Sequence, residues 1–147
     1  MRIAMGADHA GYELKEAIKS KLEGDGHEVV DVGTHDDQST DYPPFAAEAA
    51  GLVSTGEAER GVIVCGSGNG VAIVANKVAG IRAVNAHDAA EAQMARRHND
   101  INVLTLSGQR LSPDAAAPIV EEFLTGDFEG GRHERRVNEI SDVERSS

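Results

Sequence analysis

The stretch Gly61-Val-Ile-Val-Cys65-Gly66-Ser67-Gly68-Asn69-Gly70 decides how this chain folds. Its apolar run, residues 62–64, is typical of a strand that is buried on both faces. The run ends in a loop in which three of five residues are glycine, and a helical pattern follows. Glycine lets the backbone turn sharply and lets a ligand approach the main chain. Because the first amides of a helix lack internal partners, the stretch predicts a place that holds negative charge, beside Cys65 and Ser67.

The composition indicates one soluble globular domain, residues 1–147, with 40% hydrophobic residues. A net charge of −11 and an aromatic content of 3% argue against a nucleic-acid partner, which needs a basic surface. No apolar run approaches the roughly 20 residues of a membrane span, and no signal peptide precedes the first strand. The single cysteine cannot form an internal disulfide, which favours a cytoplasmic location.

Strand and helix patterns alternate along the whole chain. Strands are expected at 2–6, 27–32, 62–64, 80–84 and 102–106. Helices are expected at 12–22, 45–53, from 71 onward, at 89–97, 113–124 and about 131–145. In the third helix, the apolar positions are Val71, Ile73 and Val74. We expect Asp88 to cap the fourth helix and Ser112-Pro113 to begin the fifth. Residues 33–44 form a polar loop.

This alternation predicts a three-layer α/β/α sandwich, Rossmann-like, with a five-stranded parallel sheet. In such sheets ligands bind at the carboxyl ends of the strands. Those ends carry Asp8-His9, Cys65-Gly66-Ser67, residues 85–87 and residues 108–110, which include Arg110. We therefore expect one site at that edge of the sheet.

The glycine loop is neither a P-loop nor a dinucleotide fingerprint, because no lysine follows in place and no acidic residue closes the next strand. Anion binding and plain tight packing both remain open interpretations. Cys65 is either a small core residue or a thiolate stabilised by the neighbouring helix start. Asp8 is either the cap of the first helix or a functional carboxylate.

The other polar candidates lie towards the C-terminus. No histidine pair has the His-x-x-x-His spacing, and the lone cysteine adds no ligand cluster, so the sequence predicts no metal site. Arg132 and Arg136 are four residues apart and share one face of the last helix. Cations at a helix start are unfavourable, and a phosphate held by both arginines would explain them. The alternative is a solvated basic turn.

Taken together, these residues resemble the ribose-5-phosphate isomerase B family, which includes the allose-6-phosphate and galactose-6-phosphate isomerases. The matching segments span nearly the whole chain in one register: Gly6-Ala-Asp8-His9-Ala-Gly11, Thr40-Asp41-Tyr42-Pro43, Cys65-Gly66-Ser67-Gly68-Asn69-Gly70, residues 75–83, residues 97–104 and residues 130–137.

The resemblance implies reversible aldose–ketose isomerisation of ribose 5-phosphate and ribulose 5-phosphate through an enediolate, without metal or organic cofactor. Cys65 would be the base, and Ser67, Asp8 and His98 would assist ring opening and proton transfer. The other implied substrate contacts are His9, Tyr42, Gly66, Gly68, Asn69, Gly70, Asn99, Arg110, Arg132 and Arg136. The resemblance also implies a homodimer or dimer of dimers, with the last helix at the subunit interface and His98 reaching the neighbouring site.

Two departures and two alternatives accompany this resemblance. Part of the family has glutamate one residue beyond the glycine loop, where this chain has Val71, and many relatives have threonine at the position of Ser67. The first alternative is an isomerase of the same scaffold for a tetrulose 4-phosphate, allose 6-phosphate or galactose 6-phosphate. The second is a non-catalytic phosphate-binding module.

Overall fold

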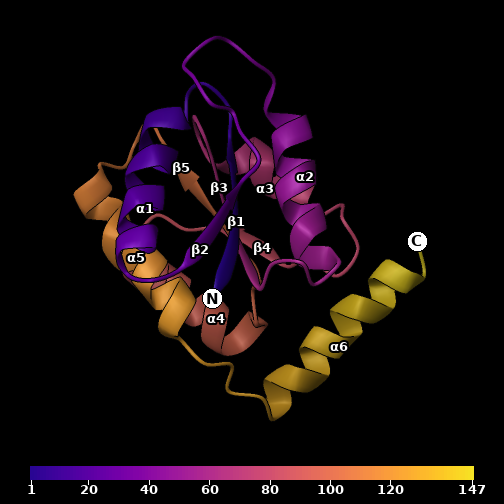
Figure 1. The fold of residues 1–147 in the computed structure, drawn as a ribbon. Helices are drawn as coiled ribbons and strands as arrows, with labels where there is room; N and C mark the ends of the chain where they lie inside the picture. Colours follow the sequence, from indigo (N-terminus) through magenta and orange to yellow (C-terminus); the bar gives the residue numbers. More distant parts are fainter.

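The computed structural model describes residues 1–147 as a parallel sheet between two layers of helices (Figure 1). The strands are β1 (Arg2–Ala7), β2 (Glu28–Asp31), β3 (Arg60–Cys65), β4 (Ala83–Asn85) and β5 (Val103–Ser107). The helices are α1 (Tyr12–Gly24), α2 (Tyr42–Ser54), α3 (Asn69–Ala75), α4 (Ala89–Asn99), α5 (Pro113–Thr125) and α6 (Arg132–Arg145). The strands lie in the order β2-β1-β3-β5-β4, all parallel, as expected.

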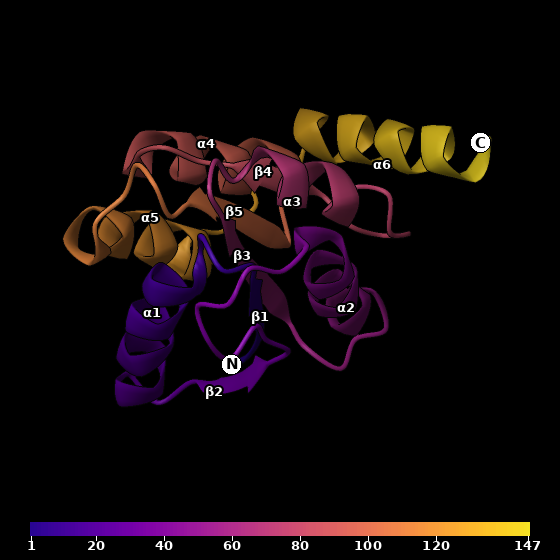
Figure 2. The same cartoon turned by 90° about the horizontal axis from the view of Figure 1, so that it is seen from above.

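The sheet has a separate apolar core on each face, and Figure 2 shows the two helical layers from above. Helices α1, α4 and α5 cover one face, where Leu104 and Phe123 are fully buried. Helices α2 and α3 cover the other face, where Ile63 and Val71 are fully buried. Burying apolar side chains on both faces stabilises the strands at about 25 cal/mol per Å² of apolar surface removed from water. The three-layer prediction is confirmed.

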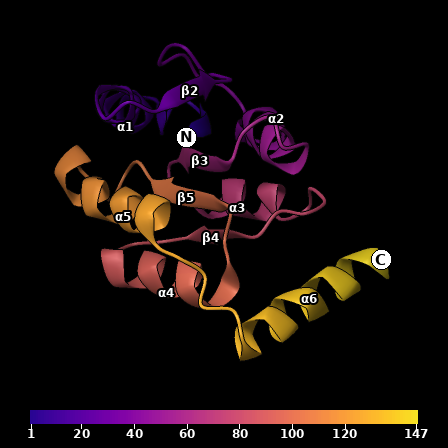
Figure 3. The same ribbon diagram turned by 60° about the horizontal axis from the view of Figure 1, so that its bottom comes forward.

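Helix α6 is the exception to this packing, because it extends away from the sheet (Figure 3). Only His133 and Val137 of this helix are buried. Ile140 and Val143 are 48% and 72% exposed, so much of the helix has no apolar partner within the chain. None of the helices combines the length and the apolar character that a bilayer crossing requires.

Several boundaries differ from the predicted ones for physical reasons. Helix α2 begins at Tyr42 rather than 45, because its two prolines occupy the first turn, where a missing N–H costs nothing. Strand β4 begins only at Ala83, because Gly80 has a positive φ and ends a turn. Ile73, expected as an apolar helix position, is 60% exposed on α3.

A buried ion pair holds the loop that follows β2. The Lys15 ammonium is fully buried and donates to both oxygens of Asp31, at 2.7 and 2.8 Å, and to the carbonyl of Thr34, at 2.7 Å. Burial alone would raise the pKa of Asp31, but hydrogen bonds from Lys15, Gly33 and Lys19 lower it overall. The beginning of the loop at 33–41 is thereby fixed to α1.

Candidate active site

The glycine loop lies at the carboxyl end of β3 and is held by its own polar groups. The Gly68 amide donates to the Cys65 sulfur over 3.1 Å, and the Asn69 amide donates to the Ser67 hydroxyl over 3.1 Å. Cys65 is 4% exposed and packs in the core under α2 and α3, so it is a buried core residue whose sulfur also accepts a loop amide. An amide aimed at sulfur stabilises the thiolate form.

Glycine is required in this loop at two positions. Gly68 has a φ of +81°, and a Cβ there would overlap Asn85 Oδ1. A Cβ on Gly70 would lie 2.5 Å from the Tyr42 ring, so the tyrosine packs directly on the loop. The expected neighbourhood of Tyr42 and the glycines is therefore present in the single chain.

Strand β5 supports the loop from beneath with two hydroxyl groups that the sequence reasoning missed. Thr105 Oγ1 donates to the Gly68 carbonyl over 2.8 Å, and Ser107 Oγ donates to the Gly66 carbonyl over 2.6 Å. The sequence did carry a signal for these two residues, because they are hydroxyl residues in an otherwise apolar strand and buried hydroxyl groups need hydrogen-bond partners. Asn85 adds a third support, donating to the Ser67 carbonyl over 3.1 Å.

Asp8 and His9 follow β1, the neighbour of β3. Ala7, the last residue of β1, pairs with Val64 of β3, so Asp8 and Cys65 each follow a member of that pair. Asp8 is not the cap of α1, because the N-cap is Gly11; instead Asp8 Oδ1 accepts the Gly11 amide over 3.0 Å. Of the two interpretations left open for Asp8, the structure excludes the helix cap, because a turn separates Asp8 from α1. His9 Nδ1 lies 3.1 Å from the Thr40 amide, which orients the exposed imidazole.

Next to Ser67 the surface is hollowed into a polar pocket of about 220 Å³. Its lining includes Ser67, Asn69 and Arg110, three of the predicted substrate contacts, together with Ser107, Gln109 and His87. The single cation in this lining that is always charged is Arg110. The pocket therefore offers room for a polar ligand beside the glycine loop.

The remaining predicted residues lie at the opposite edge of the sheet. Helix α4 begins after β4 and runs back, so His98 and Asn99 at its end lie near the amino ends of the strands. Arg132 and Arg136, both exposed, belong to α6 at that same edge. Measured along β5, at roughly 3.3 Å per residue, these two edges of the sheet are about 16 Å apart. One chain thus contains two incomplete sets of predicted site residues.

His98 belongs to a compact cluster. Its ring stacks on that of His133 with a centroid separation of 4.1 Å and an interplanar angle of 10°. Its Nε2 lies 3.4 Å from Oε1 of Glu129. Burial, followed by the charges of His98 and Arg132, lowers the pKa of His133.

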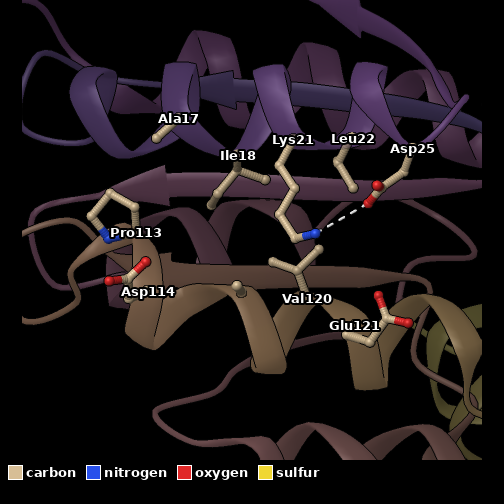
Figure 4. Close-up of a pocket in the computed structure, with 10 residues that line it drawn as sticks. Ala17, Ile18, Lys21, Leu22, Asp25, Pro113, Asp114, Val120 and Glu121 are labelled. Atoms are coloured by element: carbon tan, nitrogen blue, oxygen red, sulfur yellow. Dashed lines mark hydrogen bonds and ion pairs between the residues drawn. The ribbon is translucent and has the colours of Figure 1, made fainter.

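Two further hollows lie away from Cys65. One, of about 300 Å³, lies between α1 and α5 (Figure 4) and carries none of the predicted residues. Its charged side chains are Lys21, Asp25, Asp114 and Glu121, so acidic groups outnumber basic ones and a phosphate would be repelled. The other, of about 710 Å³, runs between α6 and β4 and is lined by Asn99, Ile140 and Val143 among others.

Comparison with known proteins decides the family. The model of the Ribose/Galactose Isomerase family matches residues 3–140. This chain belongs to that family. It is 43% identical over 143 residues to ribose-5-phosphate isomerase B of Escherichia coli, covering 97% of this chain and 96% of that protein.

Solved structures of family members agree in fold. Ribose-5-phosphate isomerase B of Clostridium thermocellum is 44% identical, with a TM-score of 0.98 and 99% of both chains covered. The enzyme of Mycoplasma genitalium, solved with bound ribulose-5-phosphate, is 37% identical, with a TM-score of 0.95 and 99% and 97% of the two chains covered. The predicted resemblance is thereby confirmed along the whole chain.

Proposed function

We propose that this protein is an aldose–ketose isomerase that interconverts ribose 5-phosphate and ribulose 5-phosphate through an enediolate. Family membership and relatives that carry the name ribose-5-phosphate isomerase B support the reaction. The ribulose-5-phosphate bound to the Mycoplasma genitalium enzyme supports the substrate class. The observation that carries the mechanism is the Gly68 amide directed at the Cys65 sulfur.

In this proposal the Cys65 thiolate removes the proton from C2 of the open-chain aldose. The electron pair of the C–H bond forms the C1–C2 double bond, and O1 takes the negative charge of the enediolate. The thiol then returns a proton to C1, and O2 becomes the ketose carbonyl as its hydroxyl proton passes to O1. Because core side chains surround Cys65 elsewhere, the substrate approaches the sulfur from the loop side.

Main-chain amides stabilise the charge on O1. The amides of Gly68 and Asn69 already have partners in Cys65 and Ser67. Those of Gly70 and Val71 lie in the first turn of α3, where amides have no acceptor within the helix. A well-placed donor of this kind contributes about 3–4 kcal/mol to stabilising the transition state.

The other predicted residues act on the sugar oxygens and the phosphate. Ser67, Asp8 and His98 assist ring opening, and Asn99 orients the intermediate. Arg132, Arg136, His9 and Arg110 bind the phosphate, which fixes the reacting carbons in place. His9 Nδ1 lies beside both the Thr40 amide and the Thr40 carbonyl, so Nε2 is the ring nitrogen left to face a phosphate oxygen.

The site is completed by a second copy of the chain in a homodimer, which can pair further into a dimer of dimers. The Cys65 half and the His98 half lie at opposite edges of one chain, so a two-fold arrangement can bring one copy's glycine loop to the other's α4 and α6. Exposed apolar side chains on α3, α4 and α6 support such an interface: Ile73, Met94, Ile140 and Val143.

The proposal includes a cytoplasmic location and a role in the pentose phosphate pathway. The location is supported by the single free cysteine, which suits a reducing compartment. The pathway is the one in which ribose 5-phosphate and ribulose 5-phosphate interconvert.

The test is incubation of the protein with ribose 5-phosphate in deuterated water, followed by NMR. We expect conversion to ribulose 5-phosphate and loss of the C2 hydrogen signal from the recovered aldose. Binding without conversion or exchange would instead indicate a non-catalytic phosphate-binding module.

The family description names galactose as well as ribose, which favours a second candidate, an isomerase of six-carbon sugar phosphates. Turnover of four-, five- and six-carbon aldose phosphates, compared as kcat/KM, distinguishes the two. If kcat/KM is highest for allose 6-phosphate or galactose 6-phosphate, that sugar phosphate and not ribose 5-phosphate is the substrate.

A further inference from the structure

Three metal-ligating side chains from separate segments meet at the amino-end edge of the sheet. His98 lies near the end of α4, Glu129 lies in the loop after α5, and His133 stands in the first turn of α6. One ligand atom from each lies within 4.8 Å of the other two. We propose that this His98–Glu129–His133 cluster binds a divalent transition-metal ion, such as Zn²⁺, Ni²⁺ or Co²⁺, and that the bound ion blocks turnover by occupying His98.

The spacing of the ligands is close to what a metal ion needs. With bonds of about 2.0–2.1 Å, neighbouring ligand atoms of a tetrahedral site are about 3.4 Å apart. The separation between His98 Nε2 and Glu129 Oε1 is already 3.4 Å. The stacked imidazole rings hold their lone pairs in two parallel planes, so one ring must turn before both can face the same ion. The His98 side chain, which is 32% exposed, is the one free to do so, while buried His133 stays in place.

The chemistry of the donors selects the class of ion. Two imidazoles and one carboxylate suit zinc, nickel and cobalt, whereas magnesium and calcium prefer sites made of oxygen ligands. The Glu129 amide donates to the Arg97 carbonyl over 3.0 Å, so the backbone of Glu129 is fixed beside the end of α4.

Positive charge around the cluster opposes an added cation. Arg97 lies 3.7 Å from the Glu129 carboxylate, and Arg132 and Arg136 flank His133 in sequence. The Arg97 side chain is 50% exposed and can move into water when an ion arrives. We therefore expect the three ligands together to be needed for measurable affinity, with no single one sufficient.

Metal binding itself does not depend on the proposed reaction. The block of turnover does rest on the proposed function, because only there does His98 act in ring opening. The two parts are therefore measured separately, first by binding to the protein without substrate and then by inhibition.

The binding experiment is a Co²⁺ titration of the full chain, followed by the visible absorption of the ion, with Ni²⁺ calorimetry in parallel. We expect one ion per chain, and an affinity weakened by at least about tenfold in Glu129→Gln and in His133→Gln. Thermal melting verifies that each variant is folded, and exposed Glu129 provides the test should His133→Gln unfold.

Two control variants keep the assignment specific. His87 and Glu91 form an exposed pair at 3.2 Å, which offers two ligands instead of three, so His87→Gln should leave binding unchanged. Cys65→Ser should also leave the affinity and the cobalt absorption spectrum unchanged, since no thiolate takes part. Three results would overturn the metal site: no binding to the wild-type protein, full affinity in Glu129→Gln, or loss of binding in either control variant.

The inhibition experiment uses Ni²⁺ with wild-type protein and Glu129→Gln. Inhibition should follow occupancy, reverse with a chelator, and need at least about tenfold more Ni²⁺ in the variant. Full turnover at saturating Ni²⁺ would overturn the block. A protein that binds cobalt through this cluster but converts no sugar phosphate would support the metal site while rejecting the proposed function.

Discussion

Cys65 is the residue on which the proposed chemistry depends most directly. Cys65→Ser keeps the size of the side chain and its hydrogen bond to the Gly68 amide but lacks a group that ionises readily. We expect kcat to fall by about 10²–10⁴-fold, the usual contribution of a general base, with KM and the melting temperature nearly unchanged. Steady-state kinetics and thermal melting check this, and an unaltered kcat would reject the thiolate mechanism.

Gly68 is the residue on which the loop's shape depends. An alanine there must adopt a φ of +81° and would bring its Cβ into Asn85 Oδ1. We expect Gly68→Ala to lower the free energy of unfolding by about 1–3 kcal/mol and to reduce kcat, because the amide that faces the sulfur moves.

A matched control for Gly68→Ala is Gly51→Ala. Gly51 lies inside α2 with ordinary helical backbone, and a Cβ added there would have no neighbouring atom within 4 Å. Its replacement should stabilise the protein by about 0.5–1 kcal/mol and leave kcat unchanged. Urea denaturation and kinetics on the two variants separate the effect of loop geometry from a general effect of an added methyl group. Equal changes in stability and kcat in both variants would contradict the role of the Gly68 backbone.

At the scale of elements, the Lys15–Asp31 pair joins α1 to the loop at 33–41. Lys15→Met leaves the buried Asp31 carboxylate and the Thr34 carbonyl without their main donor, and we expect a loss of about 3–5 kcal/mol in unfolding free energy. Lys19 binds the same carboxylate at 3.1 Å but is 28% exposed, so Lys19→Met should cost only about 0–1 kcal/mol. Urea denaturation compares the two, and similar losses would show that burial of Lys15 is unimportant.

The same pair makes stability depend on pH. The pKa of Asp31 is lowered in the folded chain from an ordinary value of 3.8. Its ionised form therefore stabilises the fold fully above that value, and the contribution is lost as pH falls below it towards the folded pKa. We expect Asp31→Asn to be less stable than wild type at neutral pH and to match it in acid, when both side chains are neutral. Denaturation curves from neutral pH down to about pH 3 check this; a constant difference would contradict it.

Most elements could be predicted because their signals are local. The run at 62–64 lies within β3, Asp88 caps α4 by accepting the Glu91 amide, and Ser112 with Pro113 begins α5. The start of α2 was missed because a pair of prolines suits both a loop and a first helical turn. Ile73 was expected to be an apolar position of α3, yet its side chain is exposed. Periodicity shows which positions are apolar but not what they pack against.

The candidate site was predictable only in part, for reasons that involve the whole molecule. Residues at the carboxyl ends of β1, β3 and β5 had to meet, because parallel strands end at one edge. Nothing local shows that α4 carries His98 to the other edge, or that Glu129 and His133 join it there. The spacing rule for metal ligands failed to find that cluster because its members come from three segments.

Two chains together provide the test of the whole-molecule proposal. If one copy's Cys65 works with the other's His98, then Cys65→Ser and His98→Asn are each inactive as homodimers. Unfolding and refolding them as an equal mixture gives mixed dimers in half of the assemblies, each with one intact site and one that carries both changes. We therefore expect about a quarter of the wild-type activity to return. A mixture as inactive as its parents, with dimers present by light scattering, would mean that each chain completes its own site.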